Sequence, residues 1–438
     1  MNTRQRLLLV GAGNMGRGYV LAARDMGIPV TLVESAARVA EYRDLVSEVV
    51  ETTGPAEQHW IQSAVMAAGR CRPTAVLAFA EPHVLGAAWV QHALGLPGPS
   101  LVAATASRDK ALQRVLLDRT SVPQPEFVIA SDFATAQEFA AGRYPVVVKA
   151  LRSTGSNGVT LVYDEAGLQA CVGNEHLLVE SFVDGPEYSV EALVRDGHVL
   201  FRNYTRKITS GPPEFVEVGH ILPVTFEQPQ VVDAMVAELV TGLGIMTGLV
   251  HAEFRVHDGR PYVMETAVRT PGDHIMELLS LAYGEDMFAQ VIRVLTGREP
   301  KLPGTADGLA GIRYLQPGPG AVVRVDGIEQ AAALPGVVRV QTASYQVGQV
   351  VRPLRSSRDR GGYAVLRAKD EAELTGRMRL FLDTVTVVTS GPGPTGPVTS
   401  PGPGSLSPHN PAVTSEISEM AVHRRRSMSG KPSRRGTD

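Results

Sequence analysis

Residues 248–275 read GLVHAEFRVHDGRPYVMETAVRTPGDHI, and this pattern predicts a β-hairpin with one polar and one apolar face. Polar and apolar side chains alternate along both strands, and an Asp-Gly pair lies at the turn. Two registers are open. A two-residue loop would pair Glu253 with Met264 and place Glu253 and Glu265 on opposite faces. A three-residue loop over 257–259, with its glycine left-handed, makes the two glutamates diagonal neighbours on one face.

We predict the three-residue loop because it keeps the apolar side chains of the two strands together: Phe254, Val256, Tyr262 and Met264. Glu253 and Glu265 would then be two carboxylates on adjacent, rigid strands, within reach of one Mg²⁺. Arg269 follows four residues later and can approach phosphate oxygens near the same ion.

Two lysines upstream lie where a polyphosphate could be held. Lys110 lies on a predicted helix in SRDKALQRVLL, and Lys149 ends the apolar strand in YPVVVKA. A loop rich in serine and glycine, residues 153–158, follows Lys149. A lysine beside a loop with many free N–H groups suits phosphate oxygens.

A third segment, HLLVESFVDGPEYSVEALV, has features that suit a nucleoside. Glu180 ends a predicted buried strand, a short hinge covers 181–183, and Glu187 follows a Gly-Pro turn. Exposed hinge backbone can pair with an adenine edge, and a nearby carboxylate can accept ribose hydroxyls. Taken singly, most of these residues are better interpreted as ordinary surface or strand side chains. Together, their order along the chain favours a common site.

A glycine-rich loop near the start supports a different hypothesis. Gly11, Gly13 and Gly16 follow the apolar run LLLV and open a helix, and Glu34 ends the next predicted strand. This spacing is typical of dinucleotide-binding folds and predicts an NAD(P)-dependent oxidoreductase. That interpretation leaves residues 144–275 without a role, and a glycine turn before a helix also has purely structural uses.

Composition narrows the function classes. The 438 residues carry a net charge of −3, with 44% hydrophobic and 20% charged residues, so neither nucleic acid nor a membrane is expected as a partner. The two cysteines, Cys71 and Cys171, are far apart in sequence and favour a reducing compartment over a disulfide framework. Only four apolar residues precede the first glycine, too few for a signal peptide, so we expect a cytoplasmic protein.

Pattern changes along the chain predict four parts. Strands and helices alternate over 1–105, which indicates a parallel sheet. Strands come closer together over 106–300, and 301–388 holds further short strands and one helix. The segment 389–438 is rich in Pro, Gly and Ser and ends in basic residues, a composition typical of disorder.

The ordered series SRDK…VVVKA…GSNGV…VESFVDGPEYSVE…HAEF…METAVRTPGDHI resembles the ATP-grasp carboxylate–amine ligases. It is most similar to the branch of L-amino acid ligases and carnosine-synthase-type enzymes, and a motif SSRDRGGYAVLRAKDEAEL extends the likeness to about residue 388. The resemblance implies an α/β and α+β protein with the ATP-grasp fold. Residues 1–105 would form a Rossmann-like preceding domain, 106–300 the two ATP-binding subdomains, and 301–388 a C-terminal α+β subdomain.

The resemblance also assigns roles to residues. ATP would be held by side chains and backbone from several segments: Lys110, Lys149, Gly155, Ser156, Gly158, Glu180, Ser181, Phe182, Val183 and Glu187. Glu253 and Glu265 would bind Mg²⁺ or Mn²⁺. Three residues would act on the reacting groups: Arg269, His220 and Lys149. Many ATP-grasp enzymes have an asparagine where this chain has Ala267, which leaves the number of metal ions open.

The activity that the resemblance implies is amide or peptide bond formation through an acyl phosphate. The partners would be a small-molecule carboxylate and amine, with an amino acid favoured by the form Glu-Thr-Ala-Val-Arg at 265–269, and a homodimer is allowed. Three alternatives stay open. They are a related ligase acting on bicarbonate or another carboxylate, the NAD(P)-dependent oxidoreductase, and a nucleotide-binding protein without catalysis.

Overall fold

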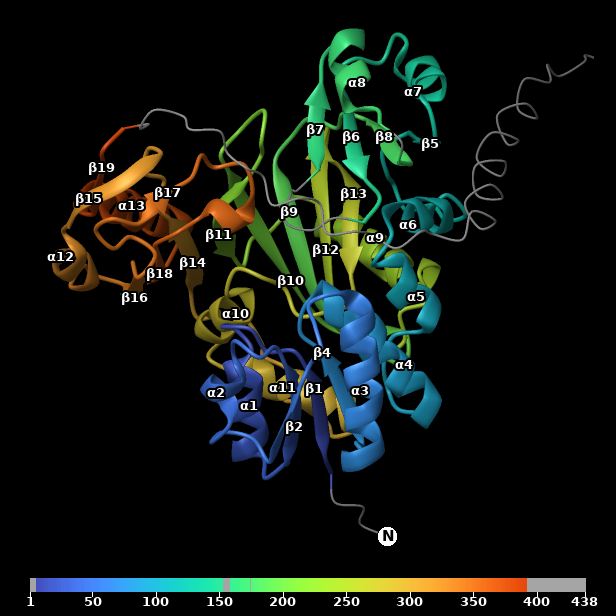
Figure 1. The fold of residues 1–438 in the computed structure, drawn as a ribbon, viewed down its shortest axis with the longest axis vertical. Helices are drawn as coiled ribbons and strands as arrows, with labels where there is room; N and C mark the ends of the chain where they lie inside the picture. Colours follow the sequence, from blue (N-terminus) through green and yellow to red (C-terminus); the bar gives the residue numbers. More distant parts are fainter. Residues whose placement is uncertain (1–4, 153–157, 174, 392–438) are drawn as a thin grey trace, which may run out of the picture. The chain divides into compact units, whose positions relative to one another are not determined.

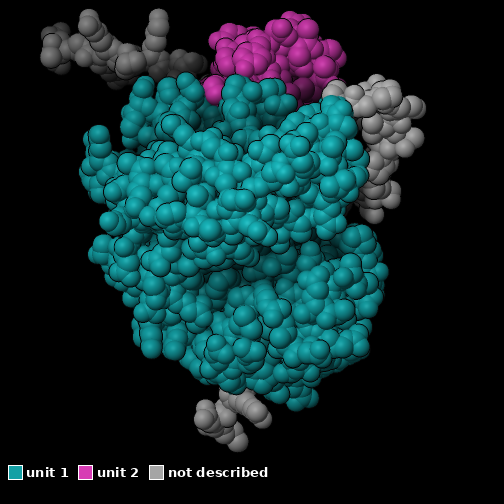
Figure 2. Space-filling view, turned by 90° about the vertical axis from the view of Figure 1, so that its left-hand side faces the viewer, with its two compact units in different colours: residues 1–125, 152–157, 183–391 teal, residues 126–151, 158–182, 392–438 magenta. Residues whose placement is uncertain are grey.

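The computed structural model describes residues 5–152, 158–173 and 175–391, and divides into two compact units (Figure 2). Within these residues, unit 1 covers 5–125, 152 and 183–391, and unit 2 covers 126–151 and 158–182 apart from position 174. Gly155, Ser156 and nearly all of the predicted tail lie outside the described residues.

A four-stranded parallel sheet with the order β3-β2-β1-β4 begins unit 1 (Figure 1). Its strands are β1 (Leu7–Val10), β2 (Val30–Glu34), β3 (Glu48–Glu51) and β4 (Ala75–Ala78). The accompanying helices are α1 (Arg17–Asp25), α2 (Val39–Tyr42), α3 (Glu57–Cys71), the 3₁₀ turn η1 (Glu81–His83), α4 (Val84–Leu94) and α5 (Leu101–Ala106). The parallel pairing of β1 with β2 and β4 confirms the prediction from alternating strands and helices.

An eight-stranded antiparallel sheet dominates unit 1, with the order β13-β12-β9-β10-β11-β14-β18-β16 (Figure 1). Its strands are β9 (Glu187–Arg195), β10 (His198–Thr209), β11 (Glu217–Leu222), β12 (Gly248–His257), β13 (Arg260–Ala267), β14 (Leu309–Tyr314), β16 (Val337–Gln341) and β18 (Tyr363–Ala368). The helices in this part of the chain are α6 (Lys110–Leu117), α9 (Pro229–Gly242), α10 (Ile275–Tyr283) and α11 (Met287–Leu295). Strands from both sides of residue 300 therefore share one sheet.

One face of this sheet is apolar and packs against α9. The helix buries Val232, Met235, Val236 and Leu239, which recur at the i, i+3, i+4 and i+7 spacing of a single helical face. Phe254 and Val263, both fully buried, belong to the same cluster. Because side chains alternate along each strand, burying this face leaves the polar residues between them on the other face.

The C-terminal part of unit 1 adds a three-stranded sheet with the order β17-β15-β19. Its elements are β15 (Gly320–Asp326), α12 (Ile328–Ala332), β17 (Val350–Val351), the 3₁₀ turn η2 (Ser357–Asp359), α13 (Glu371–Thr384) and β19 (Thr386–Thr389). Leu374, Met378 and Phe381 of α13 pack into a cluster with Leu366 of β18. None of the helices in the described part of the chain is both long and apolar enough to cross a membrane.

Unit 2 is a four-stranded sheet with the order β5-β8-β6-β7 and two helices. Its elements are β5 (Phe127–Ala130), α7 (Phe133–Ala140), β6 (Val146–Ala150), β7 (Val159–Val162), α8 (Glu165–Cys171) and β8 (Leu177–Ser181). Both helices begin after an aspartate, Asp132 or Asp164, whose carboxylate accepts from a backbone N–H of the first turn. The strands bury a separate apolar core around Val148 and Val179.

The predicted three-residue hairpin loop between β12 and β13 is wrong. His257 pairs directly with Arg260, so the turn has two residues, Asp258 and Gly259, and both have positive φ values of 48° and 74°. That is the conformation in which an Asp-Gly pair matches the twist of the flanking strands. Val263, rather than Tyr262, lies opposite Phe254, so the predicted apolar face is also corrected.

The two glutamates nevertheless share a face, because the register shifts between Glu253 and Phe254. Phe254 pairs with Val263, whereas Glu253 pairs with Glu265, so Met264 is an extra residue in β13. Such a β-bulge reverses the alternation of every residue beyond it. The predicted extra residue lay in the loop, whereas in the structure it is Met264 within β13.

Candidate functional site

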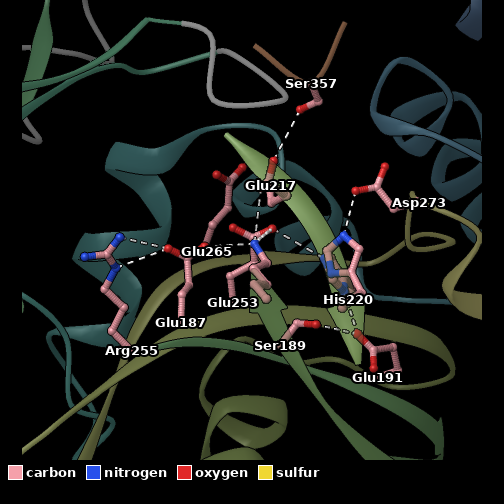
Figure 3. Close-up of polar contacts among 12 residues, drawn as sticks. Glu187, Ser189, Glu191, Glu217, His220, Glu253, Arg255, Glu265, Asp273 and Ser357 are labelled. Atoms are coloured by element: carbon pink, nitrogen blue, oxygen red, sulfur yellow. Dashed lines mark hydrogen bonds and ion pairs between the residues drawn. The ribbon is translucent and has the colours of Figure 1, made fainter. Parts of the chain in front are cut away.

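Polar side chains gather on part of the face of the eight-stranded sheet opposite α9 (Figure 3). They come from alternating positions on neighbouring strands, with Glu187, Ser189 and Glu191 on β9, Asn203, Thr205 and Lys207 on β10, and His251, Glu253 and Arg255 on β12. Most are buried, so their charges act on each other with little screening by water.

Lys207 of β10 gathers three carboxylates. Its Nζ lies 2.7 Å from Glu253, 3.0 Å from Glu187 and 3.4 Å from Glu217, and its side chain is 1% exposed. Although burial favours the neutral amine, the three carboxylates raise the pKa of Lys207 well above its ordinary value. An ammonium at this position keeps several acidic groups ionised and close together.

Glu253 is held from a second side by a buried histidine. His251 Nδ1 lies 3.1 Å from the fully buried Glu191, and its Nε2 lies 3.4 Å from Glu253. Burial alone would raise the pKa of Glu253, but Lys207 and His251 lower it well below the ordinary value. The Glu253 carboxylate is therefore ionised and restrained in direction, as a metal ligand must be.

Glu265 lies on β13, and Arg269 follows the end of that strand. Glu265 accepts from the Lys110 ammonium of α6 at 3.1 Å. Arg269 donates to Glu81 of η1 through Nε at 2.9 Å and through Nη2, and to the carbonyl of Thr270 at 2.7 Å. The charges of Glu81, Glu253 and Glu265 together raise the pKa of Arg269, despite its burial. The structure thus brings together four of the predicted site residues: Lys110, Glu253, Glu265 and Arg269.

His220 enters the site from β11, next to a cluster that the sequence did not predict. Its Nε2 lies 2.7 Å from Asp273, which also takes a forked pair of 2.6 Å bonds from Arg360. Within the described residues, the buried Nδ1 of His220 has no hydrogen-bond partner. Burial opposes ionisation of Asp273, but Arg360 and His220 hold its pKa well below the ordinary value.

Glu187, the predicted ribose ligand, is engaged by Arg255 as well as by Lys207. Arg255 Nη2 and Nε lie 3.0 and 3.1 Å from Glu187 Oε2, and its Nη1 donates to the carbonyl of Val183 at 3.2 Å. Arg255 thereby ties the predicted hinge residue Val183 to the predicted ribose carboxylate. The sequence pointed to Glu187 and Val183 but gave no role to Arg255.

The remaining predicted residues in the described part of the chain lie in unit 2. Lys149 of β6 and Glu180 of β8 form an ion pair with 2.5 Å between Nζ and Oε2, and the Glu180 side chain is 1% exposed. Ser181 donates its N–H to the carbonyl of Glu126 at 2.9 Å. Gly158 has a φ of +71° and its carbonyl accepts from Ala150, and Phe182 directly follows Ser181. The roles of these residues in ATP binding stay predictions.

Backbone N–H groups of the glycine-rich loop after β1 already donate to a side chain of the protein. Glu34 Oε2 accepts from the N–H groups of Ala12 and Gly13 at 2.9 and 3.0 Å. A Cβ on Gly11 would lie 1.9 Å from the His83 ring. A pyrophosphate would need the donors that Glu34 already takes, so the geometry does not support the dinucleotide hypothesis.

The residues of β12 and β13 fit a divalent cation bound together with a polyphosphate. Glu253 and Glu265 are direct cross-strand partners, and Mg²⁺ is commonly held by one or two carboxylates plus phosphate oxygens and water. No cluster of three or more His, Cys, Asp or Glu ligands is present in the residues that the structure describes. A metal held by these two carboxylates would take its other ligands from phosphate oxygens and water.

Several residues of the site were missed because their partners are distant in sequence. Lys207, Glu217, Glu81, Asp273 and Arg360 each acquire a role only from contacts across elements. Partial signals existed for two of them. Asp273 belongs to the quoted segment RTPGDHI, and Arg360 belongs to SSRDRGG, both of which carried the family resemblance.

Two family models match parts of the chain. Residues 165–277 match the ATP-grasp domain, and residues 313–390 match the L-amino acid ligase C-terminal domain 2. An L-amino acid ligase from Bacillus licheniformis has a similar structure, with a TM-score of 0.77 and 22% identity over 89% of this chain and all of the other. The chain therefore contains an ATP-grasp domain over residues 165–277 and has the overall fold of this L-amino acid ligase.

Two proteins with similar sequences illustrate how much of the chain is matched. The chain is 31% identical to the uncharacterized protein y4rH of Sinorhizobium fredii, over 56% of this chain and 54% of the relative. It is 26% identical to carnosine synthase 1 of Gallus gallus, over 76% of this chain and 40% of the relative. The chain therefore spans about half or less of the length of these two relatives. The proteins similar to this chain include L-amino acid ligases and carnosine synthases.

Proposed function

We propose that this protein is an ATP-dependent, ADP-forming carboxylate–amine ligase that makes an amide or peptide bond from an amino acid. The pairing of Glu253 with Glu265, between Lys207 and Lys110 and near Arg269, carries the proposal. Two carboxylates and three fixed cations suit MgATP better than an uncharged ligand. The L-amino acid ligase domain match over 313–390 favours an amino acid substrate.

In the proposed reaction, a substrate carboxylate oxygen attacks the γ-phosphorus of ATP, and the bond from that phosphorus to the bridging oxygen breaks to release ADP. An amine then attacks the acyl carbon, loses a proton, and expels inorganic phosphate. Mg²⁺ or Mn²⁺ would neutralise charge on the phosphates. Arg269, buried and positively charged, would stabilise the transferring phosphoryl group, and Lys110 would bind phosphate oxygens.

The other predicted residues complete the proposal. Lys149 would also bind phosphate oxygens, and Glu180 with residues 181–183 would recognise adenine. Glu187 would hold ribose, and His220 would face the acyl phosphate. His220 is oriented by Asp273, which supports a positioning role for the Asp273–Arg360 pair. Water must be excluded while the acyl phosphate exists.

The test is to incubate the protein with MgATP and pairs of amino acids, measuring ADP and phosphate and identifying products by mass spectrometry. We expect ADP formation that requires a carboxylic acid, with one amide formed for each ADP released. Glu265→Gln should remove turnover while the protein stays folded, because it removes a metal ligand and no core side chain. Phosphate release without any carboxylic acid, or formation of AMP, would contradict the proposal.

A homodimer belongs to the same proposal and can be tested separately. Light scattering after gel filtration should give about twice the mass of one chain. A mass equal to one chain at micromolar concentration would contradict the dimer and leave the proposed chemistry untouched.

A further inference from the structure

The Met264 bulge decides whether the two glutamates can meet. From the turn to Phe254 the hairpin follows a regular register, in which Glu253 would face Met264 and Glu265 would project from the opposite face. The extra residue shifts Glu265 by one position and places it opposite Glu253. A strand that lost the bulge would carry the Glu265 carboxylate away from the polar face.

Helix α6 contacts the bulged segment at three successive residues. Gln113 forms two bonds with the main chain of Thr266, accepting from its N–H at 2.8 Å and donating to its carbonyl at 2.9 Å. Arg114 donates to the carbonyl of Met264 at 2.7 Å. Lys110 contacts the Glu265 carboxylate between them. These three residues of α6 have the i, i+3, i+4 spacing of one helical face.

The position of β13 explains why these side chains matter. β13 is the last strand in the order of its sheet, so among the described residues no strand pairs with the outward N–H and C=O groups of 264–266. Gln113 presents one acceptor and one donor to Thr266, as a paired strand would. Gln113 is 2% exposed and Arg114 is 1% exposed, so water cannot readily replace them.

The first turn of α6 is capped, and the capping residue has a contact outside the helix. Asp109 caps its first turn by accepting from the N–H groups of Ala111 and Leu112, each at 3.1 Å. The opposite side of the same aspartate meets Arg152 at 3.2 Å. The cap opposes unwinding of the first turn, which carries Lys110 and leads into Gln113 and Arg114.

We propose that Gln113 and Arg114 are positioning residues that hold the Met264 bulge and so keep Glu265 opposite Glu253 for metal binding. This inference rests on the proposed function, in which the two glutamates bind the divalent ion. Neither residue needs to touch the metal or the nucleotide. Their effect is transmitted through the backbone of 264–266, in the way that outer contacts orient metal ligands.

The test uses Mn²⁺ binding in the presence of ADP, followed by electron paramagnetic resonance, which reports occupancy without turnover. Gln113→Met keeps side-chain length and removes both bonds to Thr266. We expect the dissociation constant for Mn²⁺ to rise by at least about tenfold, the usual effect of losing a residue that orients a ligand. An unchanged constant would overturn the inference.

Gln290 offers a matched control. It is 3% exposed, its amide nitrogen donates to the carbonyl of Asp286 at 3.2 Å, and its oxygen accepts from the N–H of Lys301 at 2.7 Å. Gln290→Met therefore removes the same two kinds of bond in α11, which lies outside the bulged segment. We expect a similar loss of thermal stability with the Mn²⁺ constant within about twofold of the parent. An equal rise in both variants would overturn the inference, since a general loss of stability would then explain it.

A second variant and the Mn²⁺ binding of the parent separate failure of the inference from failure to fold and from failure of the proposed function. If Gln113→Met does not fold, Gln113→Glu retains the bond from the Thr266 N–H, and it should still raise the Mn²⁺ constant at least about threefold. An unchanged constant in that variant overturns the inference. If the parent protein binds no Mn²⁺ with ADP, the proposed function fails first, and the inference fails with it. If the parent binds Mn²⁺ and both Gln113 variants bind it equally well, the inference is overturned and the proposed function is not.

Discussion

Arg269 and Glu81 form an ion pair that joins two parts of unit 1 separated by 188 residues in sequence. Arg269 follows β13, and Glu81 begins the short turn after β4. Both Nε and Nη2 of the guanidinium donate to the same carboxylate oxygen, Oε1. The candidate phosphate-binding arginine is thus oriented by the N-terminal parallel sheet.

Glu81→Gln should lower stability in a pH-dependent manner. Burial opposes ionisation of Glu81, but Arg269 lowers its pKa from 4.5 to about 2. Its contribution, about 3 kcal/mol, is present above pH 4.5 and is lost as the pH falls towards 2. Urea unfolding of parent and variant should show the full difference at pH 6 and a smaller one at pH 3. A difference that stays constant over this range would contradict the pairing.

His83→Phe should change the acid sensitivity of the N-terminal sheet. Burial against Trp60 lowers the pKa of His83 from 6.5 to about 4. Neutral His83 stabilises the fold fully above pH 6.5, and this contribution is lost as the pH falls towards 4. The stability difference between parent and variant should fall by about 2 to 3 kcal/mol between pH 7.5 and 4.5. Parallel stability curves would contradict the expectation.

Gly11→Ala should be more harmful than an ordinary left-handed glycine substitution. Gly11 has a φ of +72°, and an added Cβ would lie 1.9 Å from His83 Cε1. Gly27 has a similar φ of +69° with nothing within 4 Å, so Gly27→Ala isolates the backbone cost. Chemical denaturation should show a loss of about 1 kcal/mol for Gly27→Ala and about 3 kcal/mol or more for Gly11→Ala. Equal losses would mean that the loop and His83 move apart freely.

Lys207→Met should destabilise the protein strongly, because it leaves Glu187, Glu217 and Glu253 close together without their shared cation. Losing one partner of a buried ion pair costs about 3 to 5 kcal/mol. Lys301→Met, at an exposed position, is the control and should change the free energy of unfolding by less than about 0.5 kcal/mol. Adding Glu217→Gln to Lys207→Met should restore part of the loss. No restoration would show that charge repulsion is not the cause.

The resemblance to ATP-grasp ligases and the broad architecture could be predicted from the sequence, because both depend on local sequence patterns. Parallel β1, β2 and β4 are short apolar runs separated by helical segments, and β12 and β13 alternate with period two. Glu253 and Glu265 were singled out on the same basis. β3, with the sequence EVVE, was missed because four residues with charged ends give a weak strand signal.

The register of the hairpin could not be read from the hairpin alone. The Asp-Gly turn specifies two residues in the loop, and the bulge at Met264 is supported by Gln113 and Arg114 of α6. Those contacts span about 150 residues and leave no periodic trace in 248–275. The same holds for Asp273 and Arg360. Their two hydrogen bonds join segments that are far apart in sequence, so no local pattern predicts the contact.

The continuity of the eight-stranded sheet has a consequence for protein engineering. β14 pairs with β11, and β18 with β14, so residues 309–314 and 363–368 extend the sheet that carries the candidate site. Arg360, from the same stretch, also fastens Asp273. A chimaera joined near residue 300 would bring a foreign strand to β11 and a foreign side chain to Asp273. Exchange of specificity between homologues should therefore transplant β11, β14 and β18 as a single cassette.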